Sequence, residues 1–260
     1  MGAGAHPLYR YADSAVHRMP GETRIVCLLA FVLAVVATPR ELVWPYVVFG
    51  GIVVTVWWAA RVPLCWALPR MLIETPFVVL AVLLPFAEGG ERIDVAGVSL
   101  SVTGLHAAWG IVAKSTLGVA AALTVAATTP AAELPAALSR LRVPAVMTSV
   151  LVLMIRYVDL LVAEAHRMRI ARISRGDSPR ALHQAGAVAE GVGALFLRSY
   201  ERGERVHLAM LSRGFDSRAP DLAAVGAPPR ARPGQWAVAL LPAAAAVGVA
   251  TAAWVSWMAA

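Results

Sequence analysis

The sequence has 260 residues, of which 59% are hydrophobic and only 15% are charged. Soluble domains carry about 25% charged residues, so this composition excludes an ordinary soluble fold and indicates a protein embedded in lipid. The formal net charge of +7 comes almost entirely from arginine, because Lys114 is the only lysine. The two cysteines, Cys27 and Cys65, lack the paired spacing of a disulfide framework or a zinc site.

Five apolar windows along the chain approach the roughly 20 residues that a membrane-spanning helix needs. They cover residues 25–38, 42–60, 71–87, 107–129 and 236–257. We expect each of them to cross the membrane. Between the third and fourth windows, apolar and polar residues alternate around Ala96-Gly97, and this period of two predicts a short β-hairpin.

The distribution of arginine predicts the orientation of the chain, since cytoplasmic loops carry an excess of Lys and Arg. The loop at 88–105 has three carboxylates and one arginine, whereas residues 131–232 contain 15 arginines and nine carboxylates. We therefore expect a multi-pass protein of the plasma membrane, with the N-terminus and residues 131–232 in the cytoplasm and the C-terminus outside.

Residues 131–232 contain one further apolar stretch, 143–155, which continues past Arg156 and Asp159. As a sixth span, this segment would bury two charges, each at a cost of about 2.5–3.5 kcal/mol at the bilayer centre. It would also move the arginines that follow to the outer side. We instead expect an amphipathic helix at about 145–175, lying at or under the membrane, and a second long helix at about 179–213.

The predicted fold class is therefore an all-α integral membrane protein with about five transmembrane helices and a cytoplasmic pair of long helices. Residues 1–130 form an N-terminal membrane domain with four spans in this prediction. Residues 131–232 form the cytoplasmic domain, and residues 233–260 the C-terminal transmembrane helix. Each long cytoplasmic helix extends some 45–50 Å at about 1.5 Å per residue, a length that suits a coupling element.

A ten-residue repeat ends both long helices. Residues 167–176 (RMRIARISRG) align with residues 205–214 (RVHLAMLSRG), with five identical positions at an offset of 38. Gly176 and Gly214 stand where a helix favours a left-handed C′ residue, and Arg175 and Arg213 fall in the last turn, where cations meet the helix dipole favourably. Ordinary capping would explain one such ending, but the recurrence of the whole segment favours a function for the exposed guanidinium.

At these residues the sequence resembles a known family, the transmembrane (T) component of energy-coupling-factor transporters. Ser174-Arg175-Gly176 and Ser212-Arg213-Gly214 match the two Ala-Arg-Gly motifs of that family, with serine in place of alanine. Residues 198–215 are especially similar to the cobalt-permease branch, the CbiQ type. The resemblance is strong over residues 140–216 and elsewhere rests on hydropathy and span order.

The resemblance implies a coupling subunit that links two ABC-type ATPase subunits to a substrate-binding membrane (S) subunit for the uptake of cobalt or nickel. In the family the two motifs dock into grooves on the ATPases, so residues 174–176 and 212–214 are the expected docking sites at the ends of two coupling helices. It also implies that the chain is not an enzyme, needs no cofactor and leaves metal selection to the S subunit. The alternative within the same family is a T component that serves vitamin uptake, for example of biotin.

The residues themselves agree with these expectations. No phosphate loop of the form G-x-x-x-x-G-K-[ST] occurs, because Gly110 to Ser115 lacks the glycine before Lys114. The six histidines show no metal-ligand spacing, and the tryptophans near span ends indicate an interfacial belt and not a nucleic-acid platform. An intramembrane enzyme is a second alternative, but Glu74, Lys114 and His106 form no recognisable catalytic set. Lys114 within the fourth span is predicted either to serve a function, to snorkel or to pair with Glu74.

Overall fold

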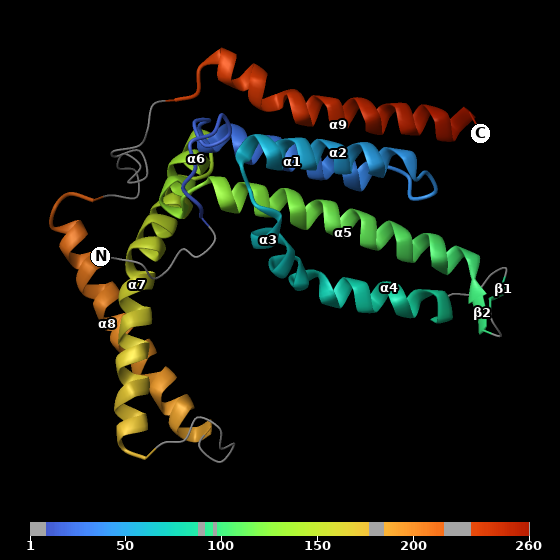
Figure 1. Ribbon diagram of the computed structural model, residues 1–260. Coiled ribbons are helices and arrows are strands. Elements are labelled where there is room, and N and C mark those ends of the chain that lie inside the picture. Colours follow the sequence, from blue (N-terminus) through green and yellow to red (C-terminus); the bar gives the residue numbers. More distant parts are fainter. Residues whose placement is uncertain (1–8, 88–91, 96–97, 177–184, 216–229, 260) are drawn as a thin grey trace. The chain divides into compact units, whose positions relative to one another are not determined.

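The protein is almost entirely helical (Figure 1). This computed structural model describes residues 9–87, 92–95, 98–176, 185–215 and 230–259. The chain divides into two compact units, which are described separately. The bundle unit comprises Leu8–Pro130 and Pro228–Ala260, and the helix-pair unit comprises Met1–Pro7 and Ala131–Ala227.

The bundle unit contains the apolar windows of the sequence, as helices that lie roughly alongside one another (Figure 1). Its elements are α1 (Gly21–Ala37), α2 (Trp44–Ala60), α3 (Leu64–Ala67), the 3-10 helix η1 (Leu68–Glu74), α4 (Thr75–Ala87), β1 (Arg92–Val95), β2 (Val98–Ser101), α5 (Val102–Thr128) and α9 (Pro233–Ala259).

Four helical stretches of the described chain are long and apolar enough to cross a membrane: Leu64–Phe86, Val102–Thr128, Ala145–Ser174 and Pro233–Ala259. The helix Trp44–Ala60 is also apolar but is shorter than these four. These helices confirm the predicted all-α membrane protein. One of the four, Ala145–Ser174, is the segment that the charge pattern placed at or under the membrane, although its length and composition also suit a span.

Small residues let α9 pack closely on α1. The buried positions of α9 are alanines spaced three or four apart: Ala239, Ala243, Ala246, Ala250 and Ala253. Such a stripe of small side chains allows close backbone approach, the usual way in which helices associate in lipid. Larger side chains fill the centre of the bundle, where the rings of Phe31 and Phe49 meet edge to face with centroids 5.9 Å apart.

Buried polar groups of the bundle are satisfied by hydrogen bonds between helices. Trp57 Nε1 of α2 donates to Thr124 Oγ1 of α5 at 2.6 Å. Glu74 accepts from Ser115 Oγ at 2.5 Å and from Thr116 Oγ1 at 2.7 Å, while Lys114 Nζ donates to the Val36 carbonyl at 2.8 Å. The predicted pairing of Lys114 with Glu74 is therefore wrong. The Lys114 side chain bonds to α1, whereas the Glu74 carboxylate bonds to the hydroxyls of two other residues of α5.

The loop between α4 and α5 forms the predicted hairpin. Strands β1 and β2 pair antiparallel, with Arg92 opposite Ser101 and Val95 opposite Val98. Ser101 then caps α5, since its side chain accepts a hydrogen bond from the Gly104 amide. The prediction of a short hairpin around residues 96–97 is confirmed for the two strands.

Gly104 holds α4 and α5 at close range, which gives a stability prediction. A Cβ at this position would lie 2.8 Å from the Leu84 carbonyl oxygen and 2.9 Å from Pro85 Cα. Gly104→Ala should therefore lower the free energy of unfolding by about 1–3 kcal/mol, the usual cost of overpacking. Gly118→Ala on the same helix is the control, because no described atom lies within 4 Å of the new methyl, and alanine favours helix. Thermal unfolding of both variants in detergent measures the difference, and equal midpoints would contradict the close packing.

The helix-pair unit contains η2 (Ala131–Glu133), α6 (Leu134–Arg140), α7 (Ala145–Ser174) and α8 (Ala185–Leu211). Helix α6 packs against the start of α7, and α7 packs against α8. The two long helices confirm the predicted elements at 145–175 and 179–213, although residues 177–184 lie outside the described part of the chain.

Candidate docking site at two helix ends

The end of α7 positions Ser174, Arg175 and Gly176. The helix ends at Ser174, and Arg175 follows as the C-cap with φ −92° and ψ 12°. Gly176 adopts a left-handed φ of +89°, and its amide donates to the Ile173 carbonyl at 3.0 Å. Glycine is the residue that takes this conformation without a Cβ penalty. The helix therefore ends directly after Arg175.

The end of α8 repeats this geometry at Ser212, Arg213 and Gly214. Gly214 has a φ of +82°, and its amide donates to the Leu211 carbonyl at 3.0 Å. The Phe215 amide donates to the Met210 carbonyl at 3.0 Å. These two bonds together form the Schellman motif, which closes a helix C-terminus through a left-handed residue. The predicted helix ends are confirmed as structures, whereas their docking role stays a prediction.

Both arginines are accessible. The residues Ser174, Arg175, Gly176, Ser212, Arg213 and Gly214 are all exposed. The serine hydroxyls bond back to their own helices, Ser174 Oγ to the Ile170 carbonyl and Ser212 Oγ to the Ala209 carbonyl, each at 3.0 Å. The serines thus help to close the last turn, while each guanidinium extends from a rigid end and can meet a carboxylate in two parallel hydrogen bonds.

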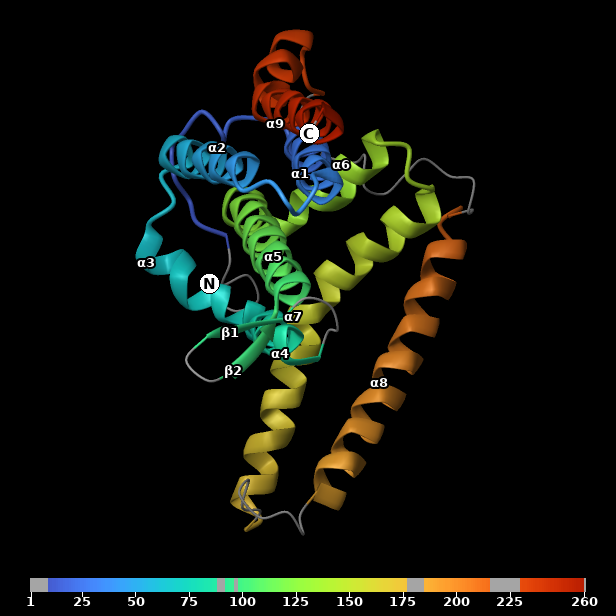
Figure 2. The ribbon, with the colours of Figure 1, turned by 90° about the vertical axis from the view of Figure 1, so that its right-hand side faces the viewer.

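Helices α7 and α8 run antiparallel (Figure 2), so their C-terminal ends lie at opposite extremes of the helix pair. Glu164 of α7 accepts from Arg198 of α8 at 2.7 Å, and further along α7 the Met168 side chain lies 3.8 Å from a Cβ placed on Gly191. The contacting positions rise along one helix as they fall along the other. Because α8 has 27 residues, the two arginine ends are separated by about one helix length, roughly 40 Å.

Glu164 is the polar centre of the helix pair, and the sequence prediction missed it. It also accepts from Arg167 of its own helix at 2.5 Å. The spacing of Glu164 and Arg167 could have indicated the local pair, but only the fold brings in Arg198. An ion pair near solvent contributes little free energy, about 0–1 kcal/mol, so its effect is to set the register of α7 against α8. Arg156 and Asp159, three residues apart on the same helix, are not among the ion pairs of the described residues.

One face of α8 is apolar and is exposed among the described residues. Val188, Val192, Phe196 and Tyr200 recur every fourth residue, so they share one face of the helix. Their exposed fractions are 47%, 63%, 66% and 59%. Burial of such side chains is worth about 1.5–3 kcal/mol each. We call these four residues the α8 stripe; it turns away from the face that carries Arg198 and Gly191 toward α7, and it suits a protein or lipid partner.

Neither helix end holds groups for catalysis or metal binding. Within the described ranges, no cluster of three or more His, Cys, Asp or Glu side chains is placed to hold a metal ion. What the two ends present is an exposed guanidinium each, a group that pairs with carboxylates.

Comparison with known proteins agrees with this description. Residues 12–222 match the sequence family CbiQ, described as cobalt transport protein. The matched range includes both Ser-Arg-Gly ends and residues 131–222 of the helix-pair unit.

Individual relatives show the same relationship. The chain is 29% identical to the cobalt transport protein CbiQ of Rhodobacter capsulatus over 64% of this chain and 69% of that protein. It is 27% identical to a putative fused cobalt transport protein CbiMQ of Methanocorpusculum labreanum over 52% of this chain and 24% of the relative. An uncharacterized protein of Methanocaldococcus jannaschii is 31% identical over 39% of this chain, and the match spans only 38% of that relative's length.

Proposed function

Because the chain belongs to the CbiQ family of cobalt transport proteins, we propose that it is the transmembrane coupling subunit of an energy-coupling-factor transporter. In this function it links two cytoplasmic ABC-type ATPase subunits to a substrate-binding membrane subunit that takes up cobalt or nickel. The pair of exposed Ser-Arg-Gly ends, which share one sequence and each finish in a left-handed glycine, is the observation that carries the proposal. The chain itself transfers force and is not an enzyme.

Each helix end docks into a groove on one ATPase. Arg175 and Arg213 supply the planar, always charged group that binds carboxylates in a fixed orientation. The left-handed glycine after each arginine ends the helix, so that each arginine stands at the tip of its helix. The separation of about one helix length favours two distinct ATPase sites over a single shared one.

Force passes from the ATPases through the helix pair. Closure of the ATPases on ATP moves the two grooves, and each helix end follows its groove. Glu164 ties α7 to α8 at 2.7 Å through Arg198, so displacement of one helix is transmitted to the other. The α8 stripe provides the surface on which the substrate-binding subunit receives this displacement and releases its cargo.

We place the bundle unit in the bilayer, with the residues that precede α1 and α9 on the cytoplasmic side and α7 at or under the membrane. Helix α7 is long and apolar enough to cross. If it crossed, however, Arg175 would stand on the opposite side from Arg213, since the two lie at opposite ends of an antiparallel pair. Only one arginine could then reach a cytoplasmic ATPase, which argues for the non-spanning placement.

Affinity purification of the chain from membranes of its own host tests the proposal. We expect mass spectrometry to find ABC-type ATPase subunits and a second integral membrane protein in stable complex with it. Added cobalt or nickel should be retained only by preparations that contain that second membrane protein. A chain that purifies without any ATPase under conditions that keep membrane complexes intact would contradict the proposal.

The left-handed glycines give a milder prediction. In Gly214→Ala the new Cβ disfavours the φ of +82° by about 1–2 kcal/mol, so the end of α8 should fray and ATPase capture should fall by up to about tenfold. Gly214→Asn is the control, since asparagine tolerates the left-handed region, and it should retain most of the capture. Quantitative pull-down at equal expression measures both variants. Equal losses for Ala and Asn would mean that the turn itself is not what the ATPase requires.

A further inference from the structure

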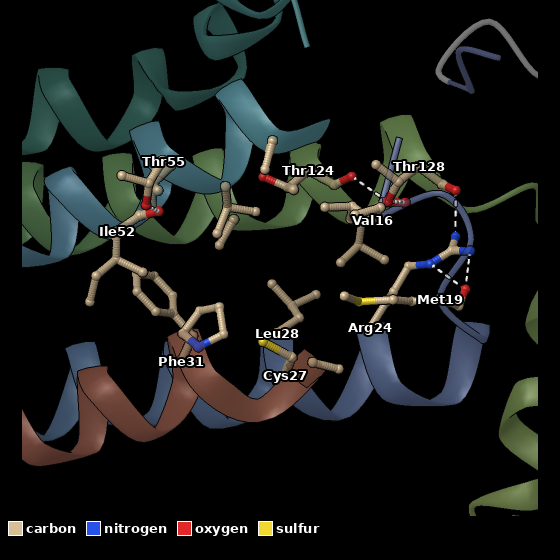
Figure 3. Close-up of a pocket in the computed structure, with 18 of the residues that line it drawn as sticks. Val16, Met19, Arg24, Cys27, Leu28, Phe31, Ile52, Thr55, Thr124 and Thr128 are labelled. Atoms are coloured by element: carbon tan, nitrogen blue, oxygen red, sulfur yellow. Dashed lines mark hydrogen bonds between the residues drawn. The ribbon is translucent and has the colours of Figure 1, made fainter. Parts of the chain in front are cut away.

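A cavity of about 390 Å³ lies within the bundle unit, between α1, α2, α5 and α9 (Figure 3). Along α1 it extends from Arg24 to Phe31, which is about 10 Å at 1.5 Å per residue. Its other walls are the second half of α2, the last turns of α5 and the start of α9, where Pro242 interrupts the helix. The cavity thus occupies one end of the bundle and extends toward its middle.

Three threonines line this cavity, but their hydroxyls donate to carbonyls of their own helices and leave the wall largely apolar. Thr55 Oγ1 donates to the Ile52 carbonyl at 2.7 Å, and Thr128 Oγ1 donates to the Thr124 carbonyl at 2.8 Å. Thr124 Oγ1 donates to the Ala120 carbonyl at 2.9 Å and accepts from Trp57. The hydroxyl protons are therefore used within the helices. The lining includes no His, Asp or Glu, so it does not suit a hydrophilic metal ion, which needs such ligands.

Arg24 lies at one end of the cavity (Figure 3), and other arginines lie in the segments near that end. The Arg24 guanidinium is buried and donates to the Thr129 hydroxyl and the His17 carbonyl, both at 2.9 Å. The Ala231 amide donates to Glu22 at 2.9 Å, which brings the segment before α9 to the same end. Ala59, near the end of α2, also lines the cavity. The segments 9–24, 59–61 and 230–233 together carry six arginines against two carboxylates, with Arg18 paired to Asp13 at 3.0 Å: Arg10, Arg18, Arg24, Arg61, Arg230 and Arg232 against Asp13 and Glu22.

We propose that this cavity binds one acyl chain of an anionic phospholipid from the cytoplasmic leaflet, with the headgroup held by the arginines at its mouth. An apolar slot takes a hydrocarbon chain, and basic pockets between helices on the cytoplasmic side bind anionic headgroups. The inference uses the orientation proposed above but not the ATPase docking, because the cavity and its arginines belong to the bundle unit alone. The lipid would fill the gap between α1, α5 and α9 and so hold these helices at a fixed distance.

Native mass spectrometry of the purified full-length chain, titrated with phosphatidylglycerol or phosphatidylcholine of the same acyl chains, tests the proposal. We expect one phosphatidylglycerol to be retained, at least about tenfold more tightly than phosphatidylcholine. Leu28→Trp fills the cavity from α1 and should lower retention of phosphatidylglycerol about tenfold. Leu29→Trp is the matched control, because Leu29 is 56% exposed and does not line the cavity. The double variant Arg18→Gln with Arg232→Gln should lower the ratio of the affinities for phosphatidylglycerol and phosphatidylcholine severalfold, while leaving the cavity unchanged.

Labelling of the two native cysteines supplies a readout without cavity variants. Cys27 lines the cavity, whereas Cys65 is exposed on α3. Phosphatidylglycerol should slow the reaction of Cys27 with N-ethylmaleimide and leave that of Cys65 unchanged. Equal retention by the two tryptophan variants, or unprotected Cys27, would overturn the assignment of the cavity. Equal affinity of the native chain for the two lipids would overturn the headgroup assignment. None of these three results bears on ATPase capture, which is measured on separate variants.

Discussion

Reversal of both helix-end charges, in the double variant Arg175→Glu and Arg213→Glu, is expected to abolish capture of the ATPase subunits while the chain still inserts into the membrane. A hydrogen bond to a charged group contributes about 1.5–3 kcal/mol, so loss of two such contacts should weaken binding by more than about 100-fold. Repulsion between the new carboxylates and an acidic groove adds to the loss. Co-purification from detergent, with the amount of ATPase measured per membrane chain, is the direct assay.

The control for this variant is Arg169→Glu with Arg205→Glu. These arginines are exposed and lie on the same two helices, six residues before Arg175 and eight before Arg213. The change in net charge is identical. They should reduce capture only slightly. Full capture by the double variant at positions 175 and 213, or equal loss in the control, would show that the helix ends are not the docking elements.

The α8 stripe is expected to carry the contact with the substrate-binding subunit. Val192→Asp with Phe196→Asp should remove that subunit from the purified complex and stop metal uptake, because burial of these two side chains is worth about 1.5–3 kcal/mol each, and a carboxylate buried in their place costs more. ATPase capture should be preserved, since the helix ends remain intact. Co-purification of the two kinds of partner, measured side by side, separates the two surfaces.

Leu197→Asp is the matched control for the stripe. Leu197 is 62% exposed, close to the 66% of Phe196, and lies one residue further along α8, about 100° around the helix. It should leave most of the subunit bound. If all three aspartate positions have the same effect, the contact is spread around α8, and if none has an effect, the partner binds elsewhere.

Local rules predicted the helix ends well. The left-handed conformation at Gly176 and Gly214 follows from the residues near each of them, because capping depends on a few neighbouring groups. The apolar windows and the hairpin were also readable, since each depends on a periodicity within one segment. Helix α7 was predicted within a residue or two because its apolar and charged halves form one continuous pattern.

Contacts between distant segments could not be predicted in the same way. The sequence offers Glu74 as a partner for Lys114, but the rotation of α5 turns Lys114 to Val36 and turns Ser115 and Thr116 to Glu74. The bond from Arg198 to Glu164 spans 34 residues and depends on how α7 and α8 pair. The apolar cavity likewise arises from four helices that no local pattern relates. Each of these features depends on packing, which a single helical period does not specify.

The antiparallel course of α7 and α8 bears on the number of ATPase subunits that one chain would bind in the proposed complex. Two helices that run in opposite directions and finish in the same ten-residue signature are related by an approximate twofold axis perpendicular to both. In the proposed complex, two like ATPase subunits arranged as a twofold-symmetric dimer would present two equivalent grooves related by an axis of the same kind. Under the proposed function, the ten-residue repeat would therefore give one chain two similar helix ends, one for each ATPase subunit of such a dimer.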